Sequence, residues 1–228
     1  GNVNASNENY IYMAIRRGPL AQPESGTEVF DVDLAPAGSN PRFVSNFPVD
    51  LGFIFRRSGG DDWYVGDRLR GKNLLRFNSA DYETPDTTIP VFDYQDGWGE
   101  NNLTAYTGWQ FRRAPGFFDV VAYTGDLSGD RVLDHNLGVP PEFILLKERT
   151  RSGTDWYVYH KDKTGFLYLN TGTGNSTEIV LNTSDTSFTM SQNVGFNSTN
   201  QDFICYLFAT LPGVSKVGSY TGNGSSQT

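Results

Sequence analysis

The sequence predicts an all-β protein made of two tandem β-sandwich repeats, jelly-roll-like, of about 95 residues each. The composition is one reason: 14% of the residues are aromatic and 25 are glycine, which suits short strands joined by tight turns. Apolar residues at helical spacing are nearly absent, which is a second reason. The third is an internal repeat, and 228 residues leave each copy enough chain to bury a core of its own.

Three markers define the repeat. Residues 62–65 and 155–158 both read Asp-Trp-Tyr-Val, which places the two tryptophans 93 residues apart, and residues 53–57 and 143–147 are aligned before them. Aromatic runs end near Pro19, Pro115 and Pro212, at spacings of 96 and 97 residues. Tyr-Thr-Gly at 123–125 returns at 220–222, again 97 residues later.

The markers divide the chain into four parts. Residues 1–20 hold the end of a preceding repeat, 21–115 a divergent repeat, 116–212 a second repeat, and 213–228 the start of a following one. We therefore expect the parent chain to continue in both directions.

Strands are expected at residues 155–160 and 165–170, where β-formers lie between turn residues. Trp63 and Trp156 are expected in the core, because matching positions with alternating neighbours suit side chains buried between two sheets. Cys205, the only cysteine, excludes an internal disulfide and is expected to be a small buried hydrophobe in the run 203–208.

One stretch of sequence resembles a known family. Residues 111–125 read Phe-Arg-Arg-Ala-Pro-Gly-Phe-Phe-Asp-Val-Val-Ala-Tyr-Thr-Gly, and 135–143 read His-Asn-Leu-Gly-Val-Pro-Pro-Glu-Phe. Together with residues 155–160 and 213–224 they resemble a repeat domain of structural proteins of marine bacteriophages, and the resemblance covers about residues 105–228. It implies a sandwich that accompanies concanavalin- or laminin-G-like jelly-rolls on the virus particle, and it supplies no catalytic residues.

The first repeat departs from this pattern. Residues 29–34 replace the Tyr-Thr-Gly strand, and no His-Asn-Leu-Gly element precedes Phe53.

The best candidate binding residues lie in the polar turn 94–102. An aromatic residue at a loop tip can stack on a sugar ring while nearby amides bond its hydroxyls, which nominates Tyr94, Trp98, Asn101 and Asn102. The alternative is that this turn packs against a neighbouring domain or subunit.

No cofactor is expected. Asp126, Asp130 and Asp134 could bring oxygens around calcium, but they lack the spacing of an EF-hand and are more simply an acidic turn. His135 and His160 lack a second ligand at zinc-like spacing, and His135 is expected to be hydrogen-bonded locally in a shaped turn.

Catalysis is not expected. Asp61, Asp62 and Asp155 beside the tryptophans suggest a sugar site, but their recurrence in both repeats favours a role in the framework. Nucleophile elbows and phosphate-binding loops are absent from the sequence.

The sequence therefore favours a non-catalytic structural module of a phage tail-fibre or host-adhesion protein, located on the virion, with other virion proteins and host surface glycans as partners. A carbohydrate-active depolymerase domain and a purely architectural spacer are the alternatives. The net charge of −8 disfavours nucleic acid, and no apolar run suggests membrane insertion. Fibres of this kind are commonly trimeric, although the sequence has no coiled-coil heptads to establish a trimer.

Overall fold

The computed structural model describes residues 20–35, 40–60, 62–100 and 105–224. It confirms the predicted all-β sandwich fold, since antiparallel sheets make up almost all of the regular structure. The described helices are the single turns η1 (Gly26–Glu28) and α1 (Val194–Asn197). Neither is long and apolar enough to cross a membrane.

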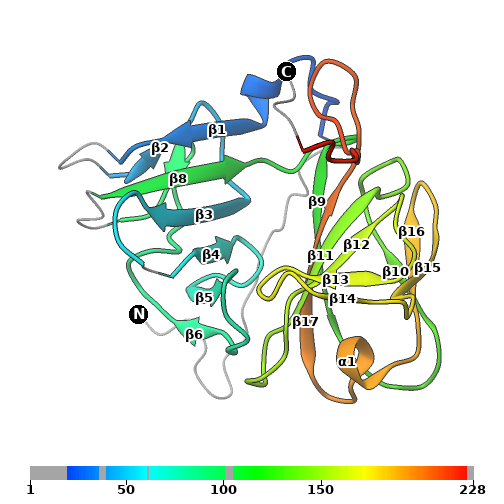
Figure 1. The fold of residues 1–228 in the computed structure, drawn as a ribbon. Coiled ribbons are helices and arrows are strands. Elements are labelled where there is room, and N and C mark those ends of the chain that lie inside the picture. Colours follow the sequence, from blue (N-terminus) through cyan, green and yellow to red (C-terminus); the bar gives the residue numbers. More distant parts are fainter. Residues whose placement is uncertain (1–19, 36–39, 61, 101–104, 225–228) are drawn as a thin grey trace, which may run out of the picture.

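The first unit contains strands β1 to β8. Its six-stranded antiparallel sheet has the order β1-β8-β3-β4-β5-β6, and the pair β2-β7 covers one face of it (Figure 1). The strands are β1 (Phe30–Asp33), β2 (Phe43–Val44), β3 (Leu51–Arg56), β4 (Tyr64–Asp67), β5 (Asn73–Arg76), β6 (Thr84–Pro85), β7 (Gly97–Trp98) and β8 (Tyr106–Phe111).

The second unit contains strands β9 to β17. Its main sheet has the order β9-β17-β11-β12-β13-β14, and the sheet β10-β16-β15 packs on one face. The strands are β9 (Phe118–Thr124), β10 (Arg131–Asp134), β11 (Phe143–Glu148), β12 (Tyr157–His160), β13 (Phe166–Tyr168), β14 (Gly174–Asn175), β15 (Val180–Thr183), β16 (Ser187–Met190) and β17 (Asp202–Phe208).

The two main sheets have the same strand order, as expected for two copies of one fold. Strand β1 pairs with β8 as β9 pairs with β17, so residues 30–33 take the place of the Tyr-Thr-Gly strand. The strand pairing also corrects the alignment of residues 53–57 with residues 143–147. Leu51 lies opposite Phe111 and Phe143 lies opposite Phe208, so Leu51, and not Phe53, corresponds to Phe143.

The main sheet of the second unit is covered on both faces, which explains the continuous apolar run in β17. Cys205 and Leu207 face the sheet β10-β16-β15, whereas Ile204 and Tyr206 face the first unit. Side chains alternate between the two faces of a strand, so both sets are buried. The prediction for Cys205 is confirmed: its thiol is fully buried.

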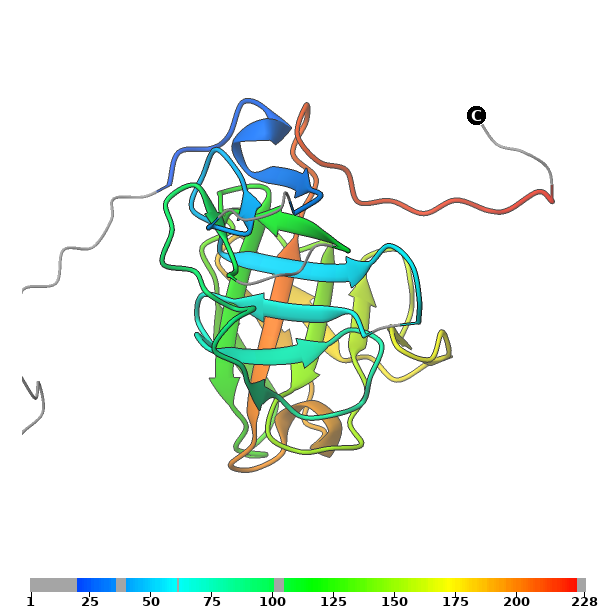
Figure 2. The same cartoon turned by 90° about the vertical axis from the view of Figure 1, so that its left-hand side faces the viewer.

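The two units share a hydrophobic core. Leu51, Val65 and Leu75 of the first sheet pack with Leu145 and Ile204 of the second. Figure 2 shows that the strands of the first sheet run across those of the second. Each main sheet is therefore sandwiched between a small sheet of its own unit and the main sheet of the other.

Trp156 is buried at the centre of this contact, as predicted, but the prediction for Trp63 is wrong. The two residues hold equivalent backbone positions, because the amide of each donates to an asparagine side chain, Asn78 for Trp63 and Asn170 for Trp156, both at 3.0 Å. Trp156 is fully buried, whereas Trp63 is 49% exposed. The reason is coverage: Phe77 of the first unit packs on Trp156, whereas the ring that packs on Trp63 in the described part of the chain is Phe55 of its own unit.

A buried polar network crosses the same contact. The Arg70 guanidinium, fully buried, forms an ion pair with Asp67 and donates to the Tyr206 hydroxyl at 3.0 Å. The Tyr206 hydroxyl in turn donates to Asp67 at 2.7 Å. Glu83 of the first unit accepts two hydrogen bonds from Arg149 of the second, at 2.8 and 3.0 Å. These pairs fix the relative position of the units, because buried charges need specific partners.

The link between the units contains a turn that recurs after the second unit. Ala114 bridges to Phe118, and 97 residues later Leu211 bridges to Ser215. Both turns contain a glycine with positive φ, Gly116 at 75° and Gly213 at 82°. The chain thus enters and leaves the second unit through two turns of the same kind.

The buried Lys147 side chain is expected to make the free energy of unfolding rise with pH above pH 8. Its ammonium is buried and donates to the carbonyl oxygens of Glu148 and Thr154 and to the Thr154 hydroxyl. Burial lowers the pKa of Lys147 to about 8 from its usual 10.5. The folded chain therefore binds fewer protons than the unfolded chain between these values, and this group makes the free energy of unfolding rise with pH there.

The measurement is urea unfolding at pH 7.5, 8.25 and 9 for the wild type and Lys147→Met. Burial raises the pKa of the Cys205 thiol, which opposes the rise above pH 9 but is common to both chains. We expect the wild type to gain stability relative to the variant as the pH rises. Parallel pH profiles would contradict the assignment.

Candidate functional site

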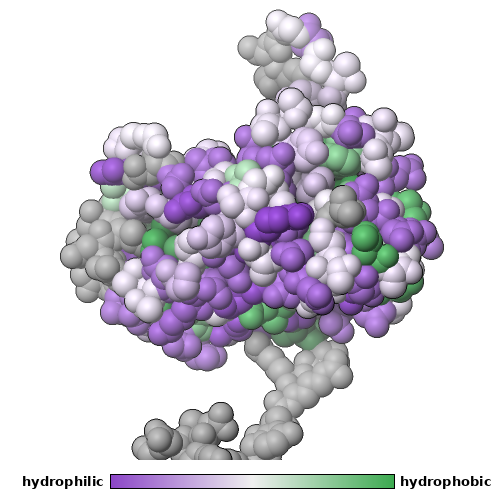
Figure 3. Space-filling view, turned by 90° about the horizontal axis from the view of Figure 1, so that it is seen from below, coloured by the Kyte–Doolittle hydropathy of each residue, from purple (hydrophilic) through white to green (hydrophobic). Residues whose placement is uncertain are grey.

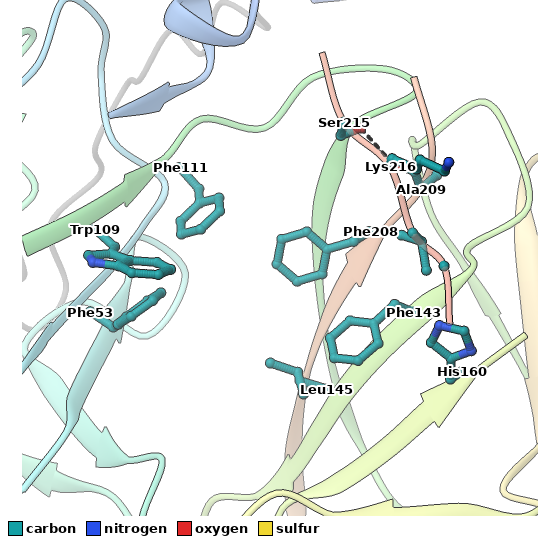
Figure 4. A pocket seen from close by; sticks show the side chains of 12 residues that line it. Phe53, Trp109, Phe111, Phe143, Leu145, His160, Phe208, Ala209, Ser215 and Lys216 are labelled. Atoms are coloured by element: carbon teal, nitrogen blue, oxygen red, sulfur yellow. Dashed lines mark hydrogen bonds between the residues drawn. The ribbon is translucent and has the colours of Figure 1, made fainter. Parts of the chain in front are cut away.

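An aromatic groove opens between the two main sheets where they diverge. Its volume is about 440 Å³. One wall comes from β3 and β8 of the first unit, with Phe53, Trp109 and Phe111, and the other from β11, β12 and β17 of the second, with Phe143 and Phe208 most prominent (Figure 4). We call this set of residues and their neighbours the aromatic groove.

Cross-strand pairing sets the first wall. Trp109 lies directly opposite Phe53 on one side and Val32 on the other. Its ring packs against Phe53 with centroids 5.0 Å apart. Trp109 is 36% exposed, so part of its ring is open to solvent, and side-chain pairs of this kind also stabilise the sheet.

Polar groups lie at the rim of the aromatic groove. His160 ends β12, and Ser215 and Lys216 follow the turn after Pro212. The Ser215 hydroxyl donates to the Ala209 carbonyl at 2.7 Å, whereas Lys216 is exposed. The arrangement joins an apolar platform to a few donors, as in sites that bind a ligand by one apolar face.

Trp98 is not at a loop tip, and this corrects the main binding prediction. It lies in β7 opposite Phe43 and is fully buried, stacked on Phe43 and Phe92. Glycines make room for it: a Cβ at Gly52 would lie 2.2 Å from the indole. Trp98 is a core residue of the first unit and cannot stack on a sugar.

Of the other residues in that prediction, the structure describes Tyr94, whose hydroxyl has a partner of its own. The Tyr94 hydroxyl donates to Glu100 at 2.8 Å, and this hydrogen bond raises the pKa of Tyr94. Asn101 and Asn102 lie outside the described residues.

Of the three aspartates considered as calcium ligands, two have separate partners. Asp126 pairs with Arg131 at 3.3 Å and accepts from the Ser128 amide, while Asp130 accepts from the Gln192 amide. Asp134 belongs to β10 and is exposed. Within the described ranges no three His, Cys, Asp or Glu side chains form a group able to hold a metal ion.

His135, Asp62 and Asp155 have structural partners. His135 accepts from the Leu137 amide, the local bond that was predicted, and burial lowers its pKa. Asp62 pairs with Arg76 at 2.9 Å, and Asp155 accepts from Asn170 at 2.6 Å. Asp61 lies outside the described residues.

A second, polar pocket of about 660 Å³ lies between the units near the link. Arg113 joins two of its carboxylates: the backbone amide donates to Asp50 at 2.8 Å and the guanidinium donates to Asp119 at 2.6 Å. Burial raises the pKa of Asp50. Asp119 also accepts from the amides of Val120 and Asn136, so its oxygens hold the entry to the second unit in place.

Outside these two sites the surface is polar where Figure 3 shows it. Seen from below, most of this face is hydrophilic, and hydrophobic residues form small separate patches. The aromatic groove is therefore the strongest candidate for binding an apolar or ring-shaped ligand.

Sequence comparisons place the chain in a family. The model of the family described as "Domain of unknown function (DUF7483)" matches residues 112–228, just over half of the chain, from the link between the units through the second unit and the segment after it. No curated protein and no solved structure matched the chain. The chain belongs to this DUF7483 family.

Proposed function

We propose that the chain is a non-catalytic structural module of a bacteriophage tail-fibre or adhesion protein, and that its aromatic groove binds host surface glycans. The observation that carries the binding part is Trp109, a partly exposed tryptophan set on a six-stranded sheet and facing a second aromatic wall. The apolar face of a sugar ring can stack on such an indole. His160 and Lys216 at the rim are placed to bond hydroxyl or acidic groups.

The structural part rests on the shared core and on the resemblance of residues 105–228 to repeats of phage structural proteins. Two sandwiches joined through buried apolar and charged groups give a stiff body, which suits a part that carries load or extends from a particle. Its partners would then be neighbouring virion proteins, with trimeric assembly as the arrangement common to fibres. Antibody labelling of purified particles in the electron microscope tests the virion location.

A purely architectural spacer is the second candidate. It is favoured by the apolar floor of the aromatic groove, which a neighbouring repeat could cover as readily as a ligand.

The binding test is an array of bacterial surface polysaccharides probed with the wild type, Trp109→Ala and Trp63→Ala. Trp63 is the matched control, since it is exposed on the same sheet but does not line the groove. Loss of one stacking platform is expected to weaken binding about tenfold or more, corresponding to about 1.4 kcal/mol. Trp63→Ala should bind like the wild type.

Circular dichroism of each variant confirms that it is folded, and Trp109→Phe should retain part of the binding. A folded wild type that binds no polysaccharide would contradict adhesion and leave the spacer. Equal losses in both tryptophan variants would contradict the placement in the aromatic groove.

A further inference from the structure

Residues 216–224 follow the second unit as an extended segment outside every described strand. Its beginning lies along the second unit, where the Val217 amide donates to the Thr210 hydroxyl at 3.0 Å and the Ser219 hydroxyl donates to Asp162 at 3.3 Å. Figure 2 shows the rest of the segment running away from the body of the protein. It leaves through the turn at Leu211 and Ser215, the counterpart of the turn that leads into β9. The DUF7483 match includes this segment.

Tyr220 in this segment is exposed, although the residue at the equivalent position of the second unit lies in the core. Its counterpart Tyr123 in β9 is 8% exposed and stacks on Phe203 with centroids 4.9 Å apart. Tyr220 is 84% exposed. A large aromatic side chain left in water at a position that is buried in the equivalent strand indicates a missing partner.

Gly222 gives the same indication independently. At its counterpart Gly125 a Cβ would lie 2.1 Å from the Ser198 carbonyl oxygen, so the loop before β17 requires glycine there. At Gly222 a Cβ would meet nothing within 4 Å. Nothing in the described structure therefore requires glycine at position 222, whereas a loop like the one that contacts Gly125 would require it.

The partner cannot dock on the second unit as the first unit does. The face of the main sheet that meets the first unit, with Leu145, Trp156 and Ile204, is already covered. Units that pair through equivalent faces form closed pairs, so a further unit needs another attachment.

We propose that residues 217–222 are a donor strand that pairs, antiparallel and in the register of β9 with β17, with the closing strand of another unit of this fold. In that register Tyr220 lies opposite the counterpart of Phe203, and Val217 lies opposite the counterpart of Tyr206. The inference goes beyond glycan binding and does not depend on it, because it concerns how successive unit pairs are joined.

The test fuses a second copy of residues 126–212, a unit lacking its β9, after residue 224 of the complete chain. In the added copy, the face of the main sheet that would meet a first unit has no cover. It is made polar by four substitutions to threonine, which suits strands: Leu145→Thr, Trp156→Thr, Val158→Thr and Ile204→Thr. Hydrogen exchange followed by mass spectrometry reports on residues 217–222. We expect exchange there to slow by about a hundredfold or more compared with the original chain.

Two further fusions sharpen the result. One carries Tyr220→Asp with Gly222→Val and should leave the segment unprotected. The other has the β9 sequence, residues 117–125, in place of 214–222, and should fold. If the fusion that carries the β9 sequence folds while the fusion with the natural residues 217–222 leaves that segment exchanging as in the original chain, the proposal is overturned.

Discussion

Trp156→Ala is expected to lower the free energy of unfolding by about 3–5 kcal/mol, the usual cost of deleting a buried indole. Trp156 packs on Phe77 of the other unit with centroids 4.8 Å apart, and its indole N–H donates to the Arg76 carbonyl at 2.7 Å. The substitution therefore leaves a cavity between the units and removes the shorter of two hydrogen bonds to the Arg76 carbonyl oxygen. Urea unfolding followed by tyrosine and tryptophan fluorescence measures the loss.

Trp63→Ala is the matched control, because Trp63 holds the equivalent backbone position but is exposed. Its substitution should cost about 1 kcal/mol or less. Similar losses in the two variants would contradict the view that coverage by the other unit, and not the local strand, buries Trp156.

Arg70→Met is expected to cost about 3–5 kcal/mol, because it leaves the Asp67 carboxylate buried without its counter-charge. Both side chains are fully inaccessible, and the methionine keeps most of the aliphatic volume. The Tyr206 hydroxyl remains as a donor to Asp67, but it cannot neutralise the charge. Chemical denaturation of the variant measures the effect.

Adding Asp67→Asn to Arg70→Met should recover part of the loss, since the neutral amide removes the uncompensated charge. The surface pair Lys161–Glu142 provides the comparison: Lys161→Ala should change stability little. A double variant less stable than Arg70→Met would argue that the carboxylate is not the source of the cost.

The sequence predicted the fold class and the repeat because both leave periodic signals. The Asp-Trp strands, the Tyr-Thr-Gly strand and the closing aromatic run each recur at a nearly constant spacing, and the sheets repeat in the same order. The strand of residues 202–208 was also readable, since a run of seven apolar-rich residues between polar turns is typical of a strand buried on both faces.

The burial of Trp98 was not readable from its surroundings. Gly97, Gly99 and nearby acidic residues resemble a loop tip, yet β7 pairs with β2, which is distant in sequence. A signal did exist in Gly52 and Gly108, glycines inside strands, where a Cβ would strike the rings of Trp98 and Phe43. Connecting those glycines to their partners requires the tertiary structure.

The aromatic groove was missed for a related reason. Trp109 belongs to the aromatic run that ends near Pro115, which marks the repeat, but a groove depends on how two sheets diverge, and local patterns carry no such information. Trp63 and Trp156 make the same point, since identical flanking residues led to opposite burial.

The most direct test of the shared core is calorimetry of the complete chain. If Leu51, Val65 and Trp156 belong to one core, the two units should unfold in a single transition whose calorimetric and van't Hoff enthalpies agree. Two separated transitions, one for each unit, would contradict the shared core and with it the rigid pair on which the proposed groove depends.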